Sequence, residues 1–153
     1  MLKKKLTDDL IIAIKKKDKE SVNTLRLMIA AIKDKEIALR SENNNKEISE
    51  EIIFNILKNM VKQRNESIDL YKKGNRQELV DKEKKEIDII QRFLPRQLDE
   101  AVLKKICKEI IEKLNVNNMS DMGKVMAELK KHESSSQIDM AKASSYVKIV
   151  LNN

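Results

Sequence analysis

The sequence is poor in the residues that form turns, crosslinks and catalytic centres. Its 153 residues include two glycines, one proline, one cysteine and one histidine, and no tryptophan. So little glycine and proline leaves few residues suited to β-hairpin turns, whereas the abundant Lys, Glu, Leu and Met favour helices. The composition therefore predicts an all-α protein.

The single cysteine, Cys107, excludes an intramolecular disulfide and fits a reducing compartment. No stretch approaches the roughly 20 consecutive apolar residues of a membrane-spanning helix. The N-terminal residues are basic and then acidic, without the apolar run of a signal peptide. We therefore expect a cytoplasmic protein with no membrane partner.

Motifs for catalysis and for cofactors are equally scarce. A zinc site needs several Cys or His ligands, and a nucleophilic triad needs a base and an orienting acid beside its nucleophile. The lone His132 lies at a charged helix end, so we interpret it as a helix-capping residue; Cys107 is interpreted as half-buried and inert. No glycine-rich nucleotide loop occurs. The sequence thus predicts no catalytic residue, no metal and no cofactor.

Positive charge is the most visible feature that is present. The formal net charge is +7, which suits an anionic partner such as nucleic acid. The charge is nevertheless spread out: residues 1–95 hold 22 Lys+Arg and 17 Asp+Glu, and residues 96–153 hold 10 and 8. A mixed, solvated surface has the same appearance. Charge alone therefore does not single out a binding surface.

Pro95, the only proline, interrupts the helical pattern. Proline lacks an amide hydrogen and disfavours helical geometry at the residue before it, so a helix should end near Phe93 or Leu94. Longer helix-patterned segments precede this point and shorter ones follow it. We expect a larger N-terminal helical bundle over residues 1–95 and a smaller three-helix subdomain over residues 96–153.

Apolar residues recur at helical spacing in about seven segments. In the first, Leu6, Leu10, Ile11 and Ile14 are expected to share a buried face. The polar stretch 41–46 is expected to be an exposed loop. Gly74 is expected to end a helix in the left-handed conformation. N-caps are predicted at Asp18, Ser49, Asn75, Asp99 and Ser120.

Two local features could carry more than packing. Gln63 and Arg64 lie beside a predicted apolar stripe, where they form either a structural hydrogen-bond network or a ligand site. Gly123 and Lys124 lie in the first turn of a short helix, where exposed amides and a cation can hold a phosphate. The alternative for Gly123 is that it allows close helix packing.

Taken together, the segments resemble the YqeY family, stand-alone relatives of the C-terminal tail of the GatB component of the tRNA-dependent amidotransferase. The likeness covers nearly the whole chain in order and spacing. The matching residues are Lys62-Gln63-Arg64, Ser67, Tyr71, Gly74, Arg76, Leu79-Val80, Glu83, Glu86, Phe93-Leu94-Pro95, Gln97-Leu98 and Met122-Gly123-Lys124-Val125-Met126. One departure occurs beside Asp139, where Ser136 and Met140 occupy positions at which the family has glycine.

This resemblance implies an all-α fold in two parts and a role beside tRNA in translation. In the amidotransferase the tail grips tRNA while the chemistry lies elsewhere, so the resemblance implies a tRNA-associated accessory protein that is non-catalytic alone. Two alternatives stay open: a component of an amidotransferase complex, with carbon–nitrogen ligase activity and glutamine as amido donor, or a helical protein-interaction module. Expected partners are tRNA and either the aminoacyl-tRNA amidotransferase or other translation proteins.

The smaller C-terminal part is the expected contact with the RNA backbone. Residues suited to reading base edges are few, so the contact should be electrostatic and led by shape. The candidate tRNA-binding residues are Gly123, Lys124, Lys130, Lys131, Lys142 and Lys148.

Overall fold

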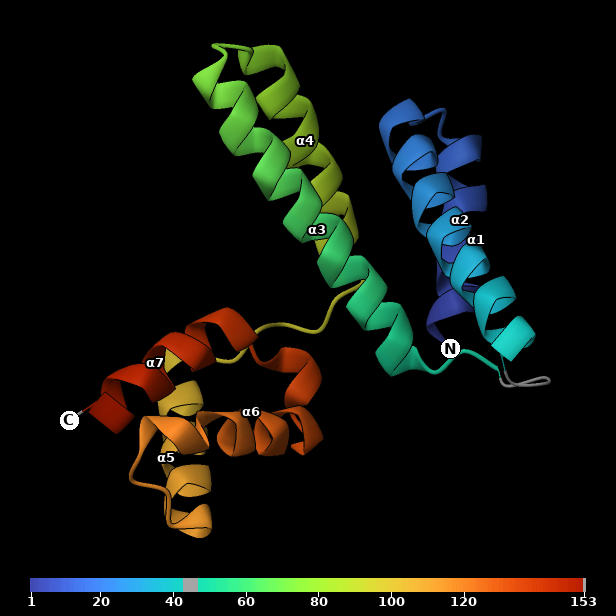
Figure 1. The fold of residues 1–153 in the computed structure, drawn as a ribbon. Coiled ribbons are helices and arrows are strands. Elements are labelled where there is room, and N and C mark those ends of the chain that lie inside the picture. The colour runs from blue at the N-terminus through green and yellow to red at the C-terminus, as the bar shows by residue number, and fades with distance from the viewer. Residues whose placement is uncertain (43–46, 153) are drawn as a thin grey trace. The chain divides into compact units, whose positions relative to one another are not determined.

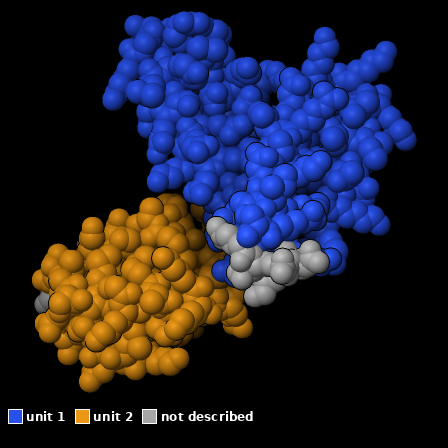
Figure 2. All heavy atoms as spheres, turned by 45° about the vertical axis from the view of Figure 1, so that its right-hand side comes forward, with its two compact units in different colours: residues 1–94 blue, residues 95–153 orange. Residues whose placement is uncertain are grey.

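All regular structure in the described part of the chain is helical. The computed structural model describes residues 1–42 and 47–152, which form seven α-helices, two short 3₁₀ helices and no strand (Figure 1). The all-helical prediction is therefore confirmed. The chain divides into two compact units, residues 1–94 and 95–153 (Figure 2).

The first unit consists of two antiparallel helical hairpins. Helix α1 (Leu2–Lys15) packs along α2 (Lys19–Glu42), and α3 (Glu50–Lys73) packs along α4 (Gln77–Gln91), with α2 also touching both helices of the second pair. The main core draws on all four helices. Its fully buried members include Leu6, Met28, Ile32, Leu57 and Ile90.

A smaller apolar cluster lies farther along the α3–α4 hairpin. Its buried members are Ile68, Val80 and Ile87, with Val61 and Tyr71 packed against them. With three buried residues, this part of the hairpin has little apolar burial of its own. It therefore depends more than the rest of the unit on polar contacts between its helices.

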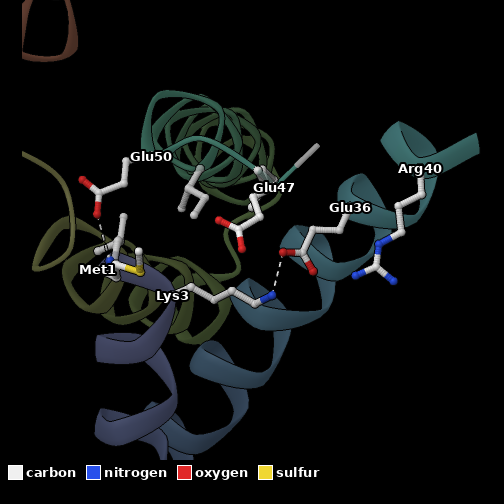
Figure 3. Close-up of a pocket in the computed structure, with 9 residues that line it drawn as sticks. Met1, Lys3, Glu36, Arg40, Glu47 and Glu50 are labelled. Atoms are coloured by element: carbon white, nitrogen blue, oxygen red, sulfur yellow. Dashed lines mark hydrogen bonds and ion pairs between the residues drawn. The ribbon is translucent and has the colours of Figure 1, made fainter. Parts of the chain in front are cut away.

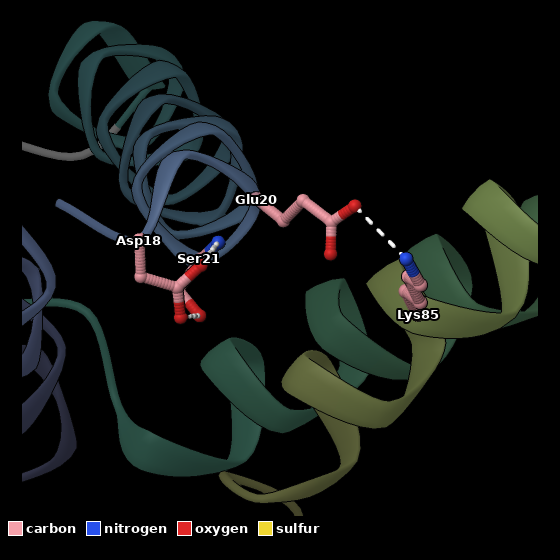
Figure 4. A network of polar contacts seen from close by, with 4 residues as sticks. All are labelled: Asp18, Glu20, Ser21 and Lys85. Atoms are coloured by element: carbon pink, nitrogen blue, oxygen red, sulfur yellow. Dashed lines mark hydrogen bonds and ion pairs between the residues drawn. The ribbon is translucent and has the colours of Figure 1, made fainter.

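Two of the predicted caps hold helix starts in this unit. The Asp18 carboxylate accepts hydrogen bonds from the Ser21 amide at 3.2 Å and the Ser21 hydroxyl at 2.6 Å (Figure 4), and these bonds lower the pKa of Asp18. Ser49 Oγ accepts from the Ile52 amide at 3.4 Å. Both bonds satisfy amides that have no partner within the helix.

The turn between α3 and α4 differs from the prediction. Gly74 is the C-cap of α3, as predicted, but its φ is −87°; Asn75 takes the left-handed conformation with φ 56°, and Arg76 is the N-cap of α4. The turn closes by a bond from the Arg76 amide to the Tyr71 carbonyl at 2.9 Å. Asparagine tolerates left-handed backbone better than most residues, so the glycine one position earlier is not needed for it. Lys17 and Asn115 hold the same conformation after α1 and α5.

Two predictions on α1 and α2 are also corrected. Ile11 and Ile14 are 47% and 48% exposed, because α2 covers the side of α1 that carries Leu6 and Ala13. The expected loop starts later than predicted, since α2 continues to Glu42 and the Ser41 hydroxyl donates to the Ala38 carbonyl at 2.6 Å. The rest of that expected loop, residues 43–46, lies outside the described residues.

The second unit packs three helices around its own core. These are α5 (Glu100–Leu114), α6 (Met122–Lys131) and α7 (Met140–Asn152), with 3₁₀ turns at Met119–Asp121 and Ser135–Gln137. The Leu98 amide donates to the Gln137 carbonyl at 3.0 Å and ties the start of the unit to the segment before α7. The fully buried core residues include Cys107, Val125, Leu129, Ala143 and Val147.

The start of α7 explains why the two glycines expected beside Asp139 are not needed. Asp139 Oδ1 accepts from the amides of Ala141 at 3.0 Å and Lys142 at 3.3 Å, so its side chain begins α7. Ser136 and Met140 do not have positive φ, so the backbone accepts side chains at both positions.

Of the two caps predicted in this unit, Asp99 is confirmed as an N-cap residue and Ser120 is not. Ser120 does not cap α6, because it lies within a 3₁₀ turn and Asp121 is the N-cap. Asp99 is the N-cap of α5, but its side chain makes no capping bond.

Candidate functional site

The first turn of α6 carries the predicted phosphate site. Gly123 is exposed, and a Cβ built on it would meet no atom within 4 Å. Close packing against the described part of the chain is therefore not the reason for a glycine there. Lys124 is 73% exposed, and its ammonium lies 3.1 Å from the Asp121 carboxylate at the start of the same helix. Asp121 thus offsets part of the positive charge that this helix end would offer to an anion.

The other candidate lysines lie on α6 and α7, which pack against each other. Lys131 is seven positions after Lys124 and so shares its face of α6; its ammonium lies 3.9 Å from Glu128. Lys130 is exposed on a neighbouring face. Lys142 and Lys148 are exposed on α7, a helix without acidic residues. The structure therefore brings Lys124 and Lys131 to one face of α6. On α7, Lys142 and Lys148 are exposed and no acidic residue offsets their charge within the helix.

His132 and Cys107 have structural environments. His132 is the C-cap residue of α6, and its Nδ1 accepts a hydrogen bond from the Ser134 amide at 3.1 Å, which confirms the capping interpretation. Cys107 is fully buried rather than half-buried, because it faces the core of the second unit, and burial raises the pKa of its thiol. A buried thiol with a raised pKa is a poor nucleophile.

Arg64 joins the two helices of the second hairpin. Its Nε lies 2.9 Å from Glu86 Oε2, and its guanidinium also donates to the Met60 carbonyl at 3.1 Å. The side chains of Arg64 and Glu86 are 12% and 17% exposed, so this ion pair is largely withdrawn from water. Gln63 is exposed and takes no part. Of the two interpretations, Arg64 therefore fits the structural hydrogen-bond network.

Glu83 lies one helical turn before Glu86, and the charges of Glu86 and Arg64 both act on its carboxyl. Partial burial raises the pKa of its carboxyl, the charge of Glu86 raises it further, and Arg64 lowers it. A raised pKa means that the folded protein binds this proton more tightly than the unfolded chain does. The Glu83 charge therefore opposes folding at neutral pH, and this effect disappears in acid, where both states are protonated.

Replacing Glu83 by glutamine is expected to raise the free energy of unfolding at neutral pH and to leave it nearly unchanged in acid, at about pH 3. The measurement is urea unfolding of both proteins at the two pH values, followed by circular dichroism. Asp81→Asn, an exposed charge removal on the same helix, is the matched control. Equal gains at both pH values would mean that packing, not charge, separates the variants.

One hollow lies in the first unit, where the start of α1, the end of α2 and the start of α3 meet (Figure 3). It measures about 420 Å³. Two of its carboxylates already have partners: Glu36 pairs with Lys3 at 2.6 Å, and Glu50 accepts from the Leu2 amide at 3.0 Å. The described lining contains no histidine, cysteine or serine. This hollow's described lining therefore offers no thiol, serine hydroxyl or imidazole.

The ion pair of Lys3 with Glu36 joins residues 33 positions apart, so no local sequence pattern predicted it. The same holds for the Lys85–Glu20 pair at 3.2 Å, which connects α4 to α2 (Figure 4). Both pairs depend on how the helices pack. Among residues 1–42 and 47–152, no group of three or more His, Cys, Asp or Glu side chains is arranged to hold a metal ion, and no helix is long and apolar enough to span a membrane.

Fold and site together define a small all-helical protein with two compact units and a net positive charge. Residues 3–151 match the family model described as Yqey-like protein. The chain belongs to the YqeY family.

Curated relatives of the chain include yeast proteins named "Altered inheritance of mitochondria protein 41, mitochondrial". The protein of Vanderwaltozyma polyspora is 32% identical over 76% of this chain and 64% of its own length. Those of Saccharomyces cerevisiae (strain ATCC 204508 / S288c) and Eremothecium gossypii are 35% and 36% identical over 58% of this chain and 46% of theirs. The chain thus spans about half to two thirds of the length of these relatives.

The expected cytoplasmic location is corrected by this comparison. The relatives are named as mitochondrial proteins, which contradicts an expectation of the cytoplasm. The prediction rested on a lone cysteine and on the lack of apolar segments. Neither property separates one reducing compartment from another.

Proposed function

We propose that this protein is a tRNA-associated accessory protein of translation, non-catalytic by itself, whose second unit contacts the RNA backbone at the start of α6. The observation that carries the proposal is the open space at Gly123. Glycine in a helix is less favourable than alanine by about 1 kcal/mol, and here no neighbour among the described residues requires it. A bare backbone in the first turn lets a phosphate approach amides that lack helical partners.

The surrounding charge supports the same surface. Lys124 and Lys131 share one face of α6, and Lys142 and Lys148 are exposed on α7. Phosphate contacts by lysine ammoniums position a protein on RNA without reading sequence. The choice of tRNA rests on the likeness to the amidotransferase tail, and its partners would be the amidotransferase or other translation proteins.

Reversing the charge of Lys124 (Lys124→Glu) is expected to weaken tRNA binding about tenfold, because an attractive phosphate contact becomes repulsive. The slope of log affinity against log salt should fall by about one. Fluorescence anisotropy with a labelled tRNA transcript, across a salt series, measures both quantities. Lys113→Glu on α5 makes the same charge change at an exposed site outside the proposed surface and is the matched control.

Gly123→Leu tests the close approach separately from charge. Since a Cβ at this position meets no atom of residues 1–42 and 47–152 within 4 Å, the variant should remain as stable as the parent or become more stable. Its tRNA affinity should nevertheless fall at least as much as that of Lys124→Glu. Unchanged affinity in both variants, or equal affinity for tRNA and a DNA duplex of the same length, would exclude this surface as a tRNA site.

A further inference from the structure

A second hollow lies on the surface of the α1–α2 hairpin. It measures about 200 Å³ and is lined by Lys3, Leu6 and Thr7 of α1 and by Ile29, Ile32, Lys33 and Glu36 of α2. Leu6 and Ile32 are fully buried and form its apolar floor. Because both helices contribute to this hollow, its lining residues show which face of α1 and which face of α2 lie on the same side of the hairpin.

Apolar side chains extend this floor along the hairpin. Leu10 follows Leu6 by four positions, Ile11 and Ile14 follow Thr7 by four and seven, and Val22 precedes Ile29 by seven, so each pair shares a helix face. Leu10, Val22 and Ile29 are half-buried, and Ile11 and Ile14 are about half exposed. We call the surface made by these five residues and the hollow the α1–α2 groove.

Basic side chains border the α1–α2 groove on both helices. By the same spacing, these are Lys3, Lys4, Lys15, Lys19, Arg26 and Lys33. Acidic side chains on this side are Asp8, Asp18 and Glu36; Asp18 already accepts hydrogen bonds from Ser21, and Glu36 is paired with Lys3 at 2.6 Å (Figure 3). An apolar stripe with a basic border calls for a partner that is apolar along its centre and acidic at its edges.

We propose that the α1–α2 groove binds an amphipathic helix of a partner protein whose apolar stripe is flanked by Asp and Glu. Two antiparallel helices leave a furrow into which the side chains of a third helix interdigitate. A leucine or isoleucine of that helix would enter the hollow above Leu6 and Ile32. The carboxylates beside it would reach Lys33 and Arg26.

Other anionic partners fit the α1–α2 groove less well. A lipid bilayer meets protruding apolar side chains, whereas the hollow is recessed between two helices. RNA would use the basic border, but the aliphatic stripe offers neither stacking planes nor hydrogen bonds to bases. Burying Ile11 and Ile14, in contrast, is favourable for a helical partner by the same hydrophobic effect that holds the hairpin together.

The test uses a labelled model helix of about 16 residues, long enough for four turns. Its apolar residues follow helical spacing and its edges carry Glu; a second peptide carries Lys at the same edges. Fluorescence anisotropy with the full chain should show the Glu peptide binding at least about tenfold more tightly than the Lys peptide. Arg26→Glu/Lys33→Glu should reverse that preference, while Lys82→Glu/Lys84→Glu on α4 should leave it unchanged.

A second variant removes the apolar part. Ile11→Asn/Ile14→Asn changes two half-exposed residues, so circular dichroism should show an intact fold while affinity for the Glu peptide falls about tenfold or more. Equal binding of the two peptides, or none, would overturn the proposal. Two further results would also overturn the proposal. One is that the parent chain, but not Arg26→Glu/Lys33→Glu, sediments with vesicles containing about a third anionic lipid. The other is that this double variant loses tRNA binding.

Discussion

Leu129→Ala is expected to lower the free energy of unfolding of the second unit by about 3 kcal/mol. Leu129 is fully buried on α6, in a core shared with α5 and α7. Removing the outer carbons of the side chain from such a site loses their transfer free energy and leaves a cavity that the neighbours fill incompletely. A unit as small as residues 95–153 has few other apolar contacts with which to compensate.

Cys107 provides a site-specific measurement of this effect. It is the chain's only cysteine and is fully buried in the same core, so a thiol reagent reaches it when the second unit opens. A loss of about 3 kcal/mol should accelerate labelling on the order of 100-fold. Leu57→Ala, an equally buried substitution in the first unit, is the control and should leave the labelling rate near that of the parent. Equal acceleration by both variants would show that the units unfold together.

Removing either partner of the Arg64–Glu86 pair is the next largest expected effect, with a loss of about 2 kcal/mol in each case. Both side chains are mostly withdrawn from water, so the remaining charge would be left without its partner. The loss should be greater for Arg64→Ala, because Glu83 and Glu86 would then face each other without the intervening cation. Urea unfolding at neutral pH of the parent, the two single variants and the double variant, followed by circular dichroism, completes a double-mutant cycle.

The position of this pair determines which part of the molecule should respond. Arg64 lies between Met60, in the main core of the first unit, and Ile68, in the small cluster farther along the hairpin. Hydrogen exchange should therefore increase mainly in residues 68–80. Arg64→Met/Glu86→Leu is the informative control, since an apolar pair of similar volume restores packing without charge and should regain most of the loss. If Arg64→Met/Glu86→Leu were as unstable as Arg64→Ala, the loss of charge pairing would not be the cause of the instability.

The all-helical fold could be read from the sequence because its evidence is local. Scarce glycine and proline, strong helix formers and apolar residues at helical spacing all act within a few positions. The side of α1 that is buried was harder to predict, because Leu10, Ile11 and Ile14 offer two overlapping apolar faces. Packing against α2 decides between them, and leaves Ile11 and Ile14 half exposed.

The candidate sites show the same limit. The sequence placed Gly123 and Lys124 in a first helical turn, which the structure confirms, but not the ion pair of Lys124 with Asp121, which depends on side-chain geometry. It placed Arg64 beside an apolar stripe without identifying Glu86, which lies 22 residues away, as its partner. The hollow between α1 and α2 joins side chains that are far apart in the sequence. No local pattern carries that information.

The left-handed residues Lys17 and Asn75 have a consequence for the order in which the first unit folds. Each follows a helix within a turn of a few residues, so α1 and α2, and likewise α3 and α4, are neighbours in sequence as well as in space. Short loops and contacts between sequence neighbours favour rapid folding. We therefore expect each hairpin to form as a unit, with the docking of one hairpin onto the other as the later step.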